Sequence, residues 1–141
     1  MIDHSGITVC NVENSKAFYT KALGALGYVP IICTPEAVSF GVREGHGKST
    51  DPGGDFWLSE GTPMAPRAHF AFSAATHADV DAFFAAAIAA GGIDNGAPGL
   101  RTRYHPNYYA AFILDPDGYN IEAVCHLKCH PGRHHQATDQ T

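Results

Sequence analysis

Near its end the chain reads Asp115-Pro-Asp-Gly-Tyr-Asn-Ile-Glu-Ala-Val124, and the order of turn residues and apolar residues in this stretch decides the fold that we expect. Asp-Pro-Asp-Gly is typical of a tight turn, because proline fixes its own φ angle and glycine accepts a positive one. Strand-like residues lie on both sides of the turn, over residues 108–114 and 119–126. The pattern therefore predicts an antiparallel hairpin that carries Glu122 on the last strand.

The sequence that precedes this hairpin contains a weak internal repeat with an offset of 65 residues. The positions that coincide in this register are His4 and His69, Phe18 and Phe83, Tyr19 and Phe84, and Gly27 and Gly92. A histidine, two adjacent aromatic residues and a glycine are harder to match by chance than the alanines in which the chain is rich. The repeat predicts two related modules, over residues 1–60 and 67–127.

Each half begins with an alternating strand pattern and continues with an amphipathic helix. The first helix is expected to begin at Asn14 or Ser15 and to end at Gly27, and the second to be capped by Thr76 and to end at Gly91. The short strands expected after the helices cover residues 29–33, 38–42 and 55–59 in the first half, and 92–95, 108–114 and 119–126 in the second. Each half is thus predicted to be a strand, a helix and three strands.

The composition fits one small globular domain. The chain has 141 residues and a net charge of −5 without any run of Lys or Arg, so we expect no nucleic acid partner. No apolar stretch approaches the roughly 18 residues that a membrane-spanning helix needs, and the first residues lack the pattern of a signal peptide. We therefore expect a cytoplasmic protein without a membrane partner, with one domain over residues 1–127 and a flexible, His-rich tail over residues 128–141.

Two histidines and one glutamate are the candidate metal ligands. His4 and His69 lie at matching places near the start of the two opening strands, and Glu122 lies 53 residues after His69. Two imidazoles and a carboxylate suit Fe(II), Mn(II), Ni(II) or Zn(II) and leave coordination positions open for substrate or water. The alternative is that each histidine is structural. The same spacing from His4 leads to Trp57, which cannot be a ligand but can form an apolar wall, stack on a flat substrate or simply belong to the core.

A second group of polar and aromatic residues precedes the hairpin. The candidate substrate-binding residues in it are Arg103, Tyr104, His105, Tyr108 and Tyr109. Arginine, histidine and tyrosine side chains could bind an anionic or hydroxylated substrate and supply a proton donor. The alternative is a tyrosine-rich strand that packs against the helices. Because side chains alternate along a strand, only some of these residues can face a pocket.

The runs SKAFY (residues 15–19), HFAFSA (residues 69–74) and DPDGYNIEAV (residues 115–124) resemble the glyoxalase/bleomycin-resistance/extradiol-dioxygenase superfamily, also called the vicinal oxygen chelate superfamily. The resemblance covers residues 1–127. It implies an α+β fold in which two βαβββ modules form a curved, partly open eight-stranded barrel. A divalent metal ion (Zn, Ni, Mn or Fe) is implied on the concave face, with His4, His69 and Glu122 at the positions of the superfamily's ligands.

The same resemblance implies a glyoxalase-like, metal-dependent lyase or isomerase that acts on a small oxygen-rich substrate, with Glu122 also moving a proton. Trp57 stands where glyoxalase I has a fourth ligand, which departs from that enzyme's pattern. The alternatives are an extradiol-type dioxygenase and a metal-free protein that binds a drug or metabolite, as bleomycin-resistance proteins do. We also expect a homodimer in which each chain builds its own site, because the linker over residues 61–66 is long enough for one module to fold back on the other.

Overall fold

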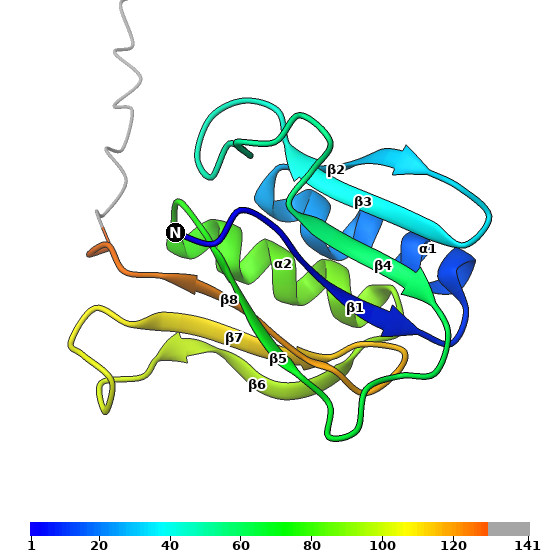
Figure 1. The fold of residues 1–141 in the computed structure, drawn as a ribbon. Coiled ribbons are helices and arrows are strands. Elements are labelled where there is room, and N and C mark those ends of the chain that lie inside the picture. The colour runs from blue at the N-terminus through cyan, green and yellow to red at the C-terminus, as the bar shows by residue number, and fades with distance from the viewer. Residues whose placement is uncertain (130–141) are drawn as a thin grey trace, which may run out of the picture.

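The computed structural model describes residues 1–129 of the chain (Figure 1). The first module contains β1 (Ser5–Val9), α1 (Val12–Ala22), the 3-10 turn η1 (Leu23–Leu26), β2 (Tyr28–Cys33), β3 (Ala37–Val42) and β4 (Phe56–Glu60). The second module contains β5 (His69–Ser73), α2 (His77–Ala89), β6 (Ile93–Leu100), β7 (Tyr109–Leu114) and β8 (Asn120–Cys125). Each module is a strand, a helix and three strands, which confirms the predicted α+β class and βαβββ order.

The eight strands form two four-stranded sheets, in the orders β1-β4-β3-β2 and β5-β8-β7-β6. In each sheet the first strand of the module pairs in parallel with the last. Gly6 of β1 pairs with Trp57 of β4, and Ala71 of β5 pairs with Glu122 of β8. Each residue of the second pair lies 65 positions after its counterpart, so the sequence repeat extends to the strand register. The two modules together form a curved, partly open arrangement of eight strands.

Side-chain caps fix where the two helices begin. Asn11 caps α1, because its side chain accepts a hydrogen bond of 3.0 Å from the backbone N–H of Asn14. The helix therefore begins before the predicted start at Asn14 or Ser15. Asn14 does not cap the helix but donates its backbone N–H to the capping residue. Thr76 caps α2 by accepting a hydrogen bond of 3.1 Å from the N–H of Asp79, which confirms the predicted start.

Glycines with a positive φ end both helical segments, as the sequence predicts. Gly27 has a φ of 91° after η1, and Gly91 has a φ of 99° two residues after α2. Only glycine adopts this backbone region without a steric penalty from a Cβ atom. Ile88, near the end of α2, is 38% exposed, because it lies at the edge of the buried stripe that contains Val80 and Ala87.

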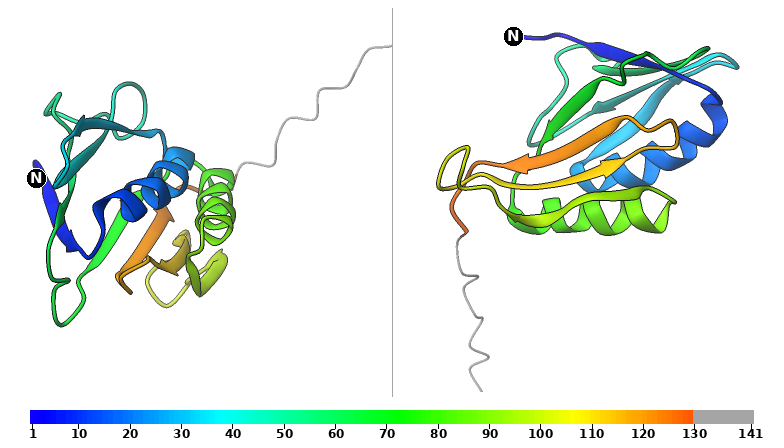
Figure 2. Two further views of the ribbon diagram at one scale, coloured as in Figure 1. Left: turned by 90° about the vertical axis from the view of Figure 1, so that its right-hand side faces the viewer. Right: turned by 90° about the horizontal axis from the view of Figure 1, so that it is seen from below.

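One hydrophobic core joins the two modules. Helix α1 packs on the first sheet, α2 packs on the second, and the two helices lie side by side (Figure 2). Phe56 of β4 packs against Phe70 and Phe72 of β5, with ring centroids 5.8 and 5.1 Å apart. The face of each sheet that is turned away from the helices, here called the outer face, carries the alternate residues. These include Gly6 and Trp57 in the first sheet and His69 and Glu122 in the second.

The β7–β8 turn ties the second module to the first. The buried carboxylate of Asp115 accepts hydrogen bonds from the N–H groups of Asp117 and Tyr119, and a third from the hydroxyl of Tyr19 on α1 at 2.5 Å. The Tyr119 hydroxyl donates to the carbonyl of Thr8 in β1. The turn that the sequence predicts as a hairpin connection is therefore also a buried polar contact between the modules.

The two helices have 11 and 13 residues, and no helix within residues 1–129 is long and apolar enough to cross a bilayer. Residues 130–141, which make up most of the predicted His-rich tail, lie outside the described residues.

Candidate metal and substrate site

Two of the three predicted metal ligands meet on the outer face of the second sheet. The Nε2 atom of His69, at the start of β5, lies 3.0 Å from Oε2 of Glu122 on β8. The Glu122 side chain is 3% exposed, whereas the His69 side chain is 46% exposed. The strand register brings them together, because His69 pairs with Asn120 and Glu122 lies two residues further along the same face. The carboxylate is thus reached from solvent past the imidazole ring.

The backbone fixes the orientation of the His69 ring. Its Nδ1 atom lies 2.9 Å from the carbonyl oxygen of Asn120. A carbonyl oxygen can only accept, so Nδ1 carries a proton and donates it. In the neutral ring the lone pair on Nε2 then points at a carboxylate oxygen, and two acceptors at this distance need a proton or a cation between them. A backbone carbonyl that holds the second ring nitrogen is also the usual arrangement around a metal-ligating histidine.

Tyr108, just before β7, holds the other oxygen of the carboxylate. Its hydroxyl donates to Oε1 of Glu122 at 2.5 Å. Burial, with the hydrogen bond to Glu122 and that group's charge adding to it, raises the pKa of Tyr108 to about 12. The phenol therefore stays protonated at neutral pH and remains a donor. Each oxygen of Glu122 has its own neighbour, Tyr108 at Oε1 and His69 at Oε2.

Two further histidines pack against Tyr108. The backbone N–H of Asn107 donates to Nδ1 of His105, so the proton of the neutral His105 ring is on Nε2. That Nε2 lies 2.8 Å from Nδ1 of His126, which must accept. Both rings meet the Tyr108 ring edge to face, with centroids 5.4 and 5.3 Å away. The histidine pair therefore supports the side of Tyr108.

The remaining predicted substrate-binding residues divide between the two sides of the second sheet. Tyr104 packs on Tyr108 with ring centroids 4.8 Å apart, and Arg103 donates to the Tyr104 hydroxyl at 3.1 Å. Tyr109 points the other way, because successive side chains on a strand alternate. Its hydroxyl donates to Asp81 of α2, and its ring stacks on His77 at 3.9 Å. The structure therefore gathers Arg103, Tyr104, His105 and Tyr108 near Glu122 but not Tyr109.

His4 lies apart from this group. Its Nδ1 atom is 2.8 Å from Oδ1 of Asp3, and the hydrogen bond to Asp3, with the charges of Asp3 and Asp51, raises its pKa above the usual value despite a smaller opposing effect of desolvation. The residues before and after it, Asp3 and Ser5, line a pocket together with Ser73 at the far end of β5. The start of β1 therefore lies beside the end of β5.

The end of β1 lies near the start of β5, so the two strands run antiparallel. Tyr119, whose hydroxyl reaches Thr8 near the end of β1, directly precedes Asn120, the partner of His69. His4 and His69 are thus separated by about the length of β5, roughly 13 Å at ~3.3 Å per residue. Metal–nitrogen bonds are about 2.0–2.1 Å long, so the two histidines of one chain cannot share an ion in this arrangement.

Within residues 1–129 no three His, Cys, Asp or Glu side chains are gathered as metal ligands. One chain therefore assembles two of the three predicted ligands, which differs from the expectation that each chain builds its own site. The antiparallel placement of β1 and β5, set by the shared core, is the physical reason. Trp57, at the position in β4 that corresponds to Glu122 in β8, is half-buried on the first sheet. Glu60, at the end of β4, accepts a hydrogen bond from the N–H of Val12 at the start of α1.

Two residues beside this group, His126 and Phe112, were not among the predicted site residues. His126 is the last residue of the strand predicted over residues 119–126, and its parity is that of Glu122, so it continues the same face just beyond β8. Phe112, which pairs with Glu122 across β7 and β8, stacks on the His69 ring with centroids 6.2 Å apart. Arg101 lies over the Phe112 ring at 5.5 Å. Counting alternate residues from Glu122 and Tyr108 would have found His126 and Phe112.

Comparison with known proteins agrees with this fold. Residues 28–123, more than half of the chain, match the family model described as the Glyoxalase/Bleomycin resistance protein/Dioxygenase superfamily. The chain belongs to this superfamily. The match includes His69, Tyr108 and Glu122 and begins after His4. No curated protein sequence shows significant similarity to the chain.

Solved structures of the glyoxalase superfamily are similar over most of this chain. A glyoxalase/bleomycin resistance protein from Albidiferax ferrireducens is 28% identical, with a TM-score of 0.69 over 87% of this chain and 96% of that one. A putative glyoxalase from Bacillus halodurans is 26% identical, with a TM-score of 0.63 over 89% and 95%. A lactoylglutathione lyase from Agrobacterium tumefaciens is 18% identical, with a TM-score of 0.59 over 89% and 92%, which shows a shared fold alone.

The site in this glyoxalase superfamily member thus consists of a buried carboxylate with a proton donor on one oxygen and an imidazole on the other. A carboxylate held in this way can ligate a cation through Oε2 or exchange a proton with a bound molecule. The Glu122 side chain is 3% exposed, whereas its neighbour His69 is half-exposed and Tyr104 is exposed. These properties suit binding and proton transfer on a small oxygen-containing compound.

Proposed function

We propose that the protein is a glyoxalase-like, metal-dependent lyase or isomerase that acts on a small oxygen-rich molecule. The observation that supports it most directly is the His69–Glu122 pair, in which an imidazole nitrogen and a carboxylate oxygen lie 3.0 Å apart. The Asn120 carbonyl keeps the ring in the orientation that a ligand needs. This donor set fits a divalent ion such as Zn, Ni, Mn or Fe. When bound, such an ion supplies polarisation of a carbonyl or enediolate oxygen.

The protein's own groups have distinct parts in this proposal. Glu122 ligates through one oxygen and is the group that moves a proton on the substrate. Tyr108 keeps the carboxylate in place by donating to Oε1. Arg103, Tyr104 and His105, which lie around Tyr108, bind the polar parts of the substrate.

Proton transfer by Glu122 predicts exchange of carbon-bound hydrogen next to a carbonyl group. We expect the metal-loaded protein to incorporate deuterium from heavy water into members of a panel of small α-hydroxy carbonyl compounds, measured by NMR. In Glu122→Gln the rate should fall about a hundredfold, because an amide is neither a base nor an anionic metal ligand. The exposed Glu13→Gln is the matched control. Equal exchange by Glu122→Gln and the unchanged protein would contradict the assignment, and oxygen consumption in place of exchange would favour a dioxygenase.

We further propose that the third ligand, His4, comes from a second copy of the chain. His4 extends from the outer face of the first sheet, and the His69–Glu122 pair lies on the outer face of the second. In a twofold dimer the first sheet of one copy can face the second sheet of the other, which makes two equal sites. Trp57 would then contribute an apolar wall, and three protein ligands leave positions open for substrate or water.

Mixed dimers test this arrangement directly. A His4→Ala chain and a Glu122→Ala chain, co-expressed with different affinity tags and purified through both, should bind one metal ion per dimer. One of the two sites then keeps His4 from one chain and His69 with Glu122 from the other, while neither variant alone keeps an intact site. Metal content by atomic emission is the measurement.

The outcomes of the mixing experiment are separable. If each chain built its own site, the mixed dimer would contain no metal, because each chain lacks one ligand. A species of 15.0 kDa in sedimentation at micromolar concentration would contradict the dimer itself. A dimer of the unchanged protein that binds two ions, with mixed dimers that bind one, supports sites shared between chains.

A further inference from the structure

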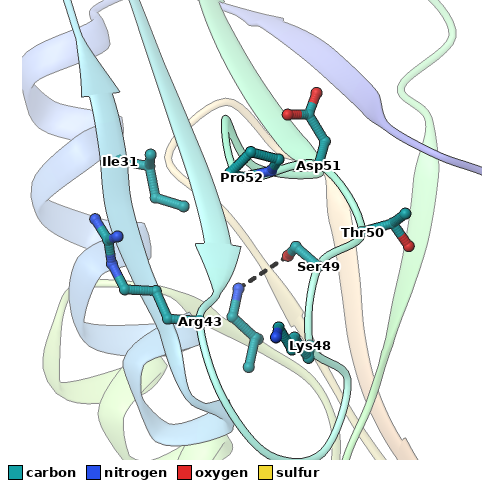
Figure 3. A pocket seen from close by; sticks show the side chains of 8 residues that line it. Ile31, Arg43, Lys48, Ser49, Thr50, Asp51 and Pro52 are labelled. Carbon is teal, nitrogen blue, oxygen red and sulfur yellow. Dashed lines mark hydrogen bonds between the residues drawn. The ribbon is translucent and has the colours of Figure 1, made fainter.

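A second pocket lies in the first module, and its lining contains none of the residues that have a role in the proposed reaction. It has a volume of about 300 Å³ and lies between β2 and the loop that joins β3 to β4. Ile31, Val42 and Pro52 supply its apolar wall, and Arg43 and Lys48 supply two positive charges. In the close view Ile31 and Pro52 lie across the upper part of the pocket with Arg43 and Lys48 below them (Figure 3).

Hydrogen bonds hold the loop that forms this pocket against β3. Ser49 accepts a hydrogen bond of 2.9 Å from the N–H of Val42, and its hydroxyl donates to Asp55 at 2.7 Å. Ser39 of β3 donates to the carbonyl of Gly53 at 2.6 Å. The contact is close, because a Cβ atom on Gly54 would lie 2.7 Å from the carbonyl oxygen of Phe40. The backbone of a loop held in this way loses little further conformational entropy when a ligand binds.

The two cationic side chains of the pocket are available to a ligand. Neither the Arg43 guanidinium nor the Lys48 ammonium makes a hydrogen bond or ion pair within residues 1–129. The hydroxyl of Ser49 is already engaged. The lining carboxylate, Asp51, accepts the N–H of Gly53 and points away from the two cations (Figure 3). The free polar groups therefore favour an anion.

The shape and charge of the pocket define the class of ligand. Arginine binds a carboxylate or phosphate through two parallel hydrogen bonds, and a nearby lysine adds a second positive charge. The apolar wall of Ile31, Val42 and Pro52 favours a ligand whose anionic group is attached to an apolar body. The chain as a whole has a net charge of −5. In this pocket, however, the positive charges of Arg43 and Lys48 repel each other, and an anion between them reduces that repulsion.

We propose that this pocket is a binding site for a small organic anion, a carboxylate or phosphate group on an apolar body, which Arg43 and Lys48 hold over Ile31 and Pro52. This site lies on the first module, whereas the His69–Glu122 pair lies on the second. It does not depend on a metal ion. Its test therefore uses metal-free protein, and its result is independent of the proposed function.

Phenyl phosphate is the probe, titrated into the isotope-labelled full chain in the presence of EDTA and followed by NMR chemical shifts. We expect saturable binding, with the shift changes centred on residues 42–52. Arg43→Gln and Lys48→Gln should each weaken binding about tenfold, because each removes a charged hydrogen bond. Inorganic phosphate should bind more weakly than phenyl phosphate, and phenol should not bind. Ile31→Ala should weaken binding of phenyl phosphate but leave that of inorganic phosphate unchanged.

Lys21→Gln, an exposed lysine in the last turn of α1, is the charge-matched control and should bind as the unchanged protein does. Unchanged unfolding temperatures of the variants exclude a loss of fold. Three results would overturn the proposal: no saturable binding, shift changes away from residues 42–52, or a loss in Lys21→Gln as large as that in Arg43→Gln. A double variant, Arg43→Gln with Lys48→Gln, that binds like the unchanged protein would overturn it as well.

Discussion

Replacing His69 by alanine is expected to abolish stoichiometric binding of a divalent metal ion. The substitution removes the only imidazole that contacts Oε2 of Glu122 within residues 1–129. A site with one carboxylate and one histidine from elsewhere binds a transition metal ion far more weakly than two imidazoles and a carboxylate do. Metal content after dialysis against a weak chelator, for Zn, Ni, Mn and Fe in turn, is the measurement. The unchanged protein should keep about one ion per chain.

His77→Ala is the control for the remaining histidines. His77 lies at the start of α2, with its ring on Tyr109 rather than near Glu122, so its loss should leave the metal content unchanged. Glu122→Gln should behave like His69→Ala. If His69→Ala retains a full ion while His77→Ala loses it, the ligand assignment is wrong. If the unchanged protein binds no ion at all, the metal-free binding of a drug or metabolite becomes the better interpretation of the same group of side chains.

The second large effect concerns stability. Asp115→Ala should lower the free energy of unfolding by about 3 to 4 kcal/mol, because it leaves the buried Tyr19 hydroxyl and two turn N–H groups without their acceptor. Tyr19 is fully buried and Asp115 is 3% exposed, so water cannot replace the lost carboxylate at the Tyr19 end. Urea denaturation at pH 7, followed by far-ultraviolet circular dichroism, measures the change.

Asp94→Ala is the matched control for this substitution. Asp94 also accepts a backbone N–H, that of Gly96, but it lies exposed on β6, and its loss should cost less than 1 kcal/mol. Tyr19→Phe combined with Asp115→Ala should cost less than the sum of the two single changes, since the two side chains share one hydrogen bond. The interpretation fails if Asp115→Ala costs no more than Asp94→Ala, or if the two losses simply add.

Much of the fold could be predicted from the sequence, because its signals are local or repeat at a fixed offset. The turn over residues 115–118 predicted the hairpin, and Thr76 predicted the start of α2. The offset between His4 and His69 predicted a register that the strands follow residue by residue. The meeting of His69 with Glu122 was expected from their spacing of 53 residues and from the superfamily resemblance. The register of β5 and β8, with His69 opposite Asn120, places both side chains on one face.

Local patterns were less reliable where more than one residue could satisfy the same requirement. Asn11, Asn14 and Ser15 are all suitable caps, and the structure uses Asn11. Tyr108 and Tyr109 are adjacent and chemically alike, yet one contacts Glu122 and the other contacts Asp81 on α2. Which of the two faces the site depends on the exact residue at which β7 begins, and sequence patterns define strand ends poorly.

The sequence by itself determined the two modules, the register within each sheet and the meeting of His69 with Glu122. Only the tertiary structure decided how the modules lie relative to each other, and therefore that His4 lies about one strand length from His69. That placement follows from the contact of Phe56 with Phe70 and Phe72 and from the hydrogen bond of Tyr19 to Asp115, which is 96 residues away in the chain. Contacts between residues so far apart in the chain form when the apolar faces of the two modules pack together. The periodicity of a strand or helix shows which of its own faces is apolar, but not which face of the other module will pack against that face.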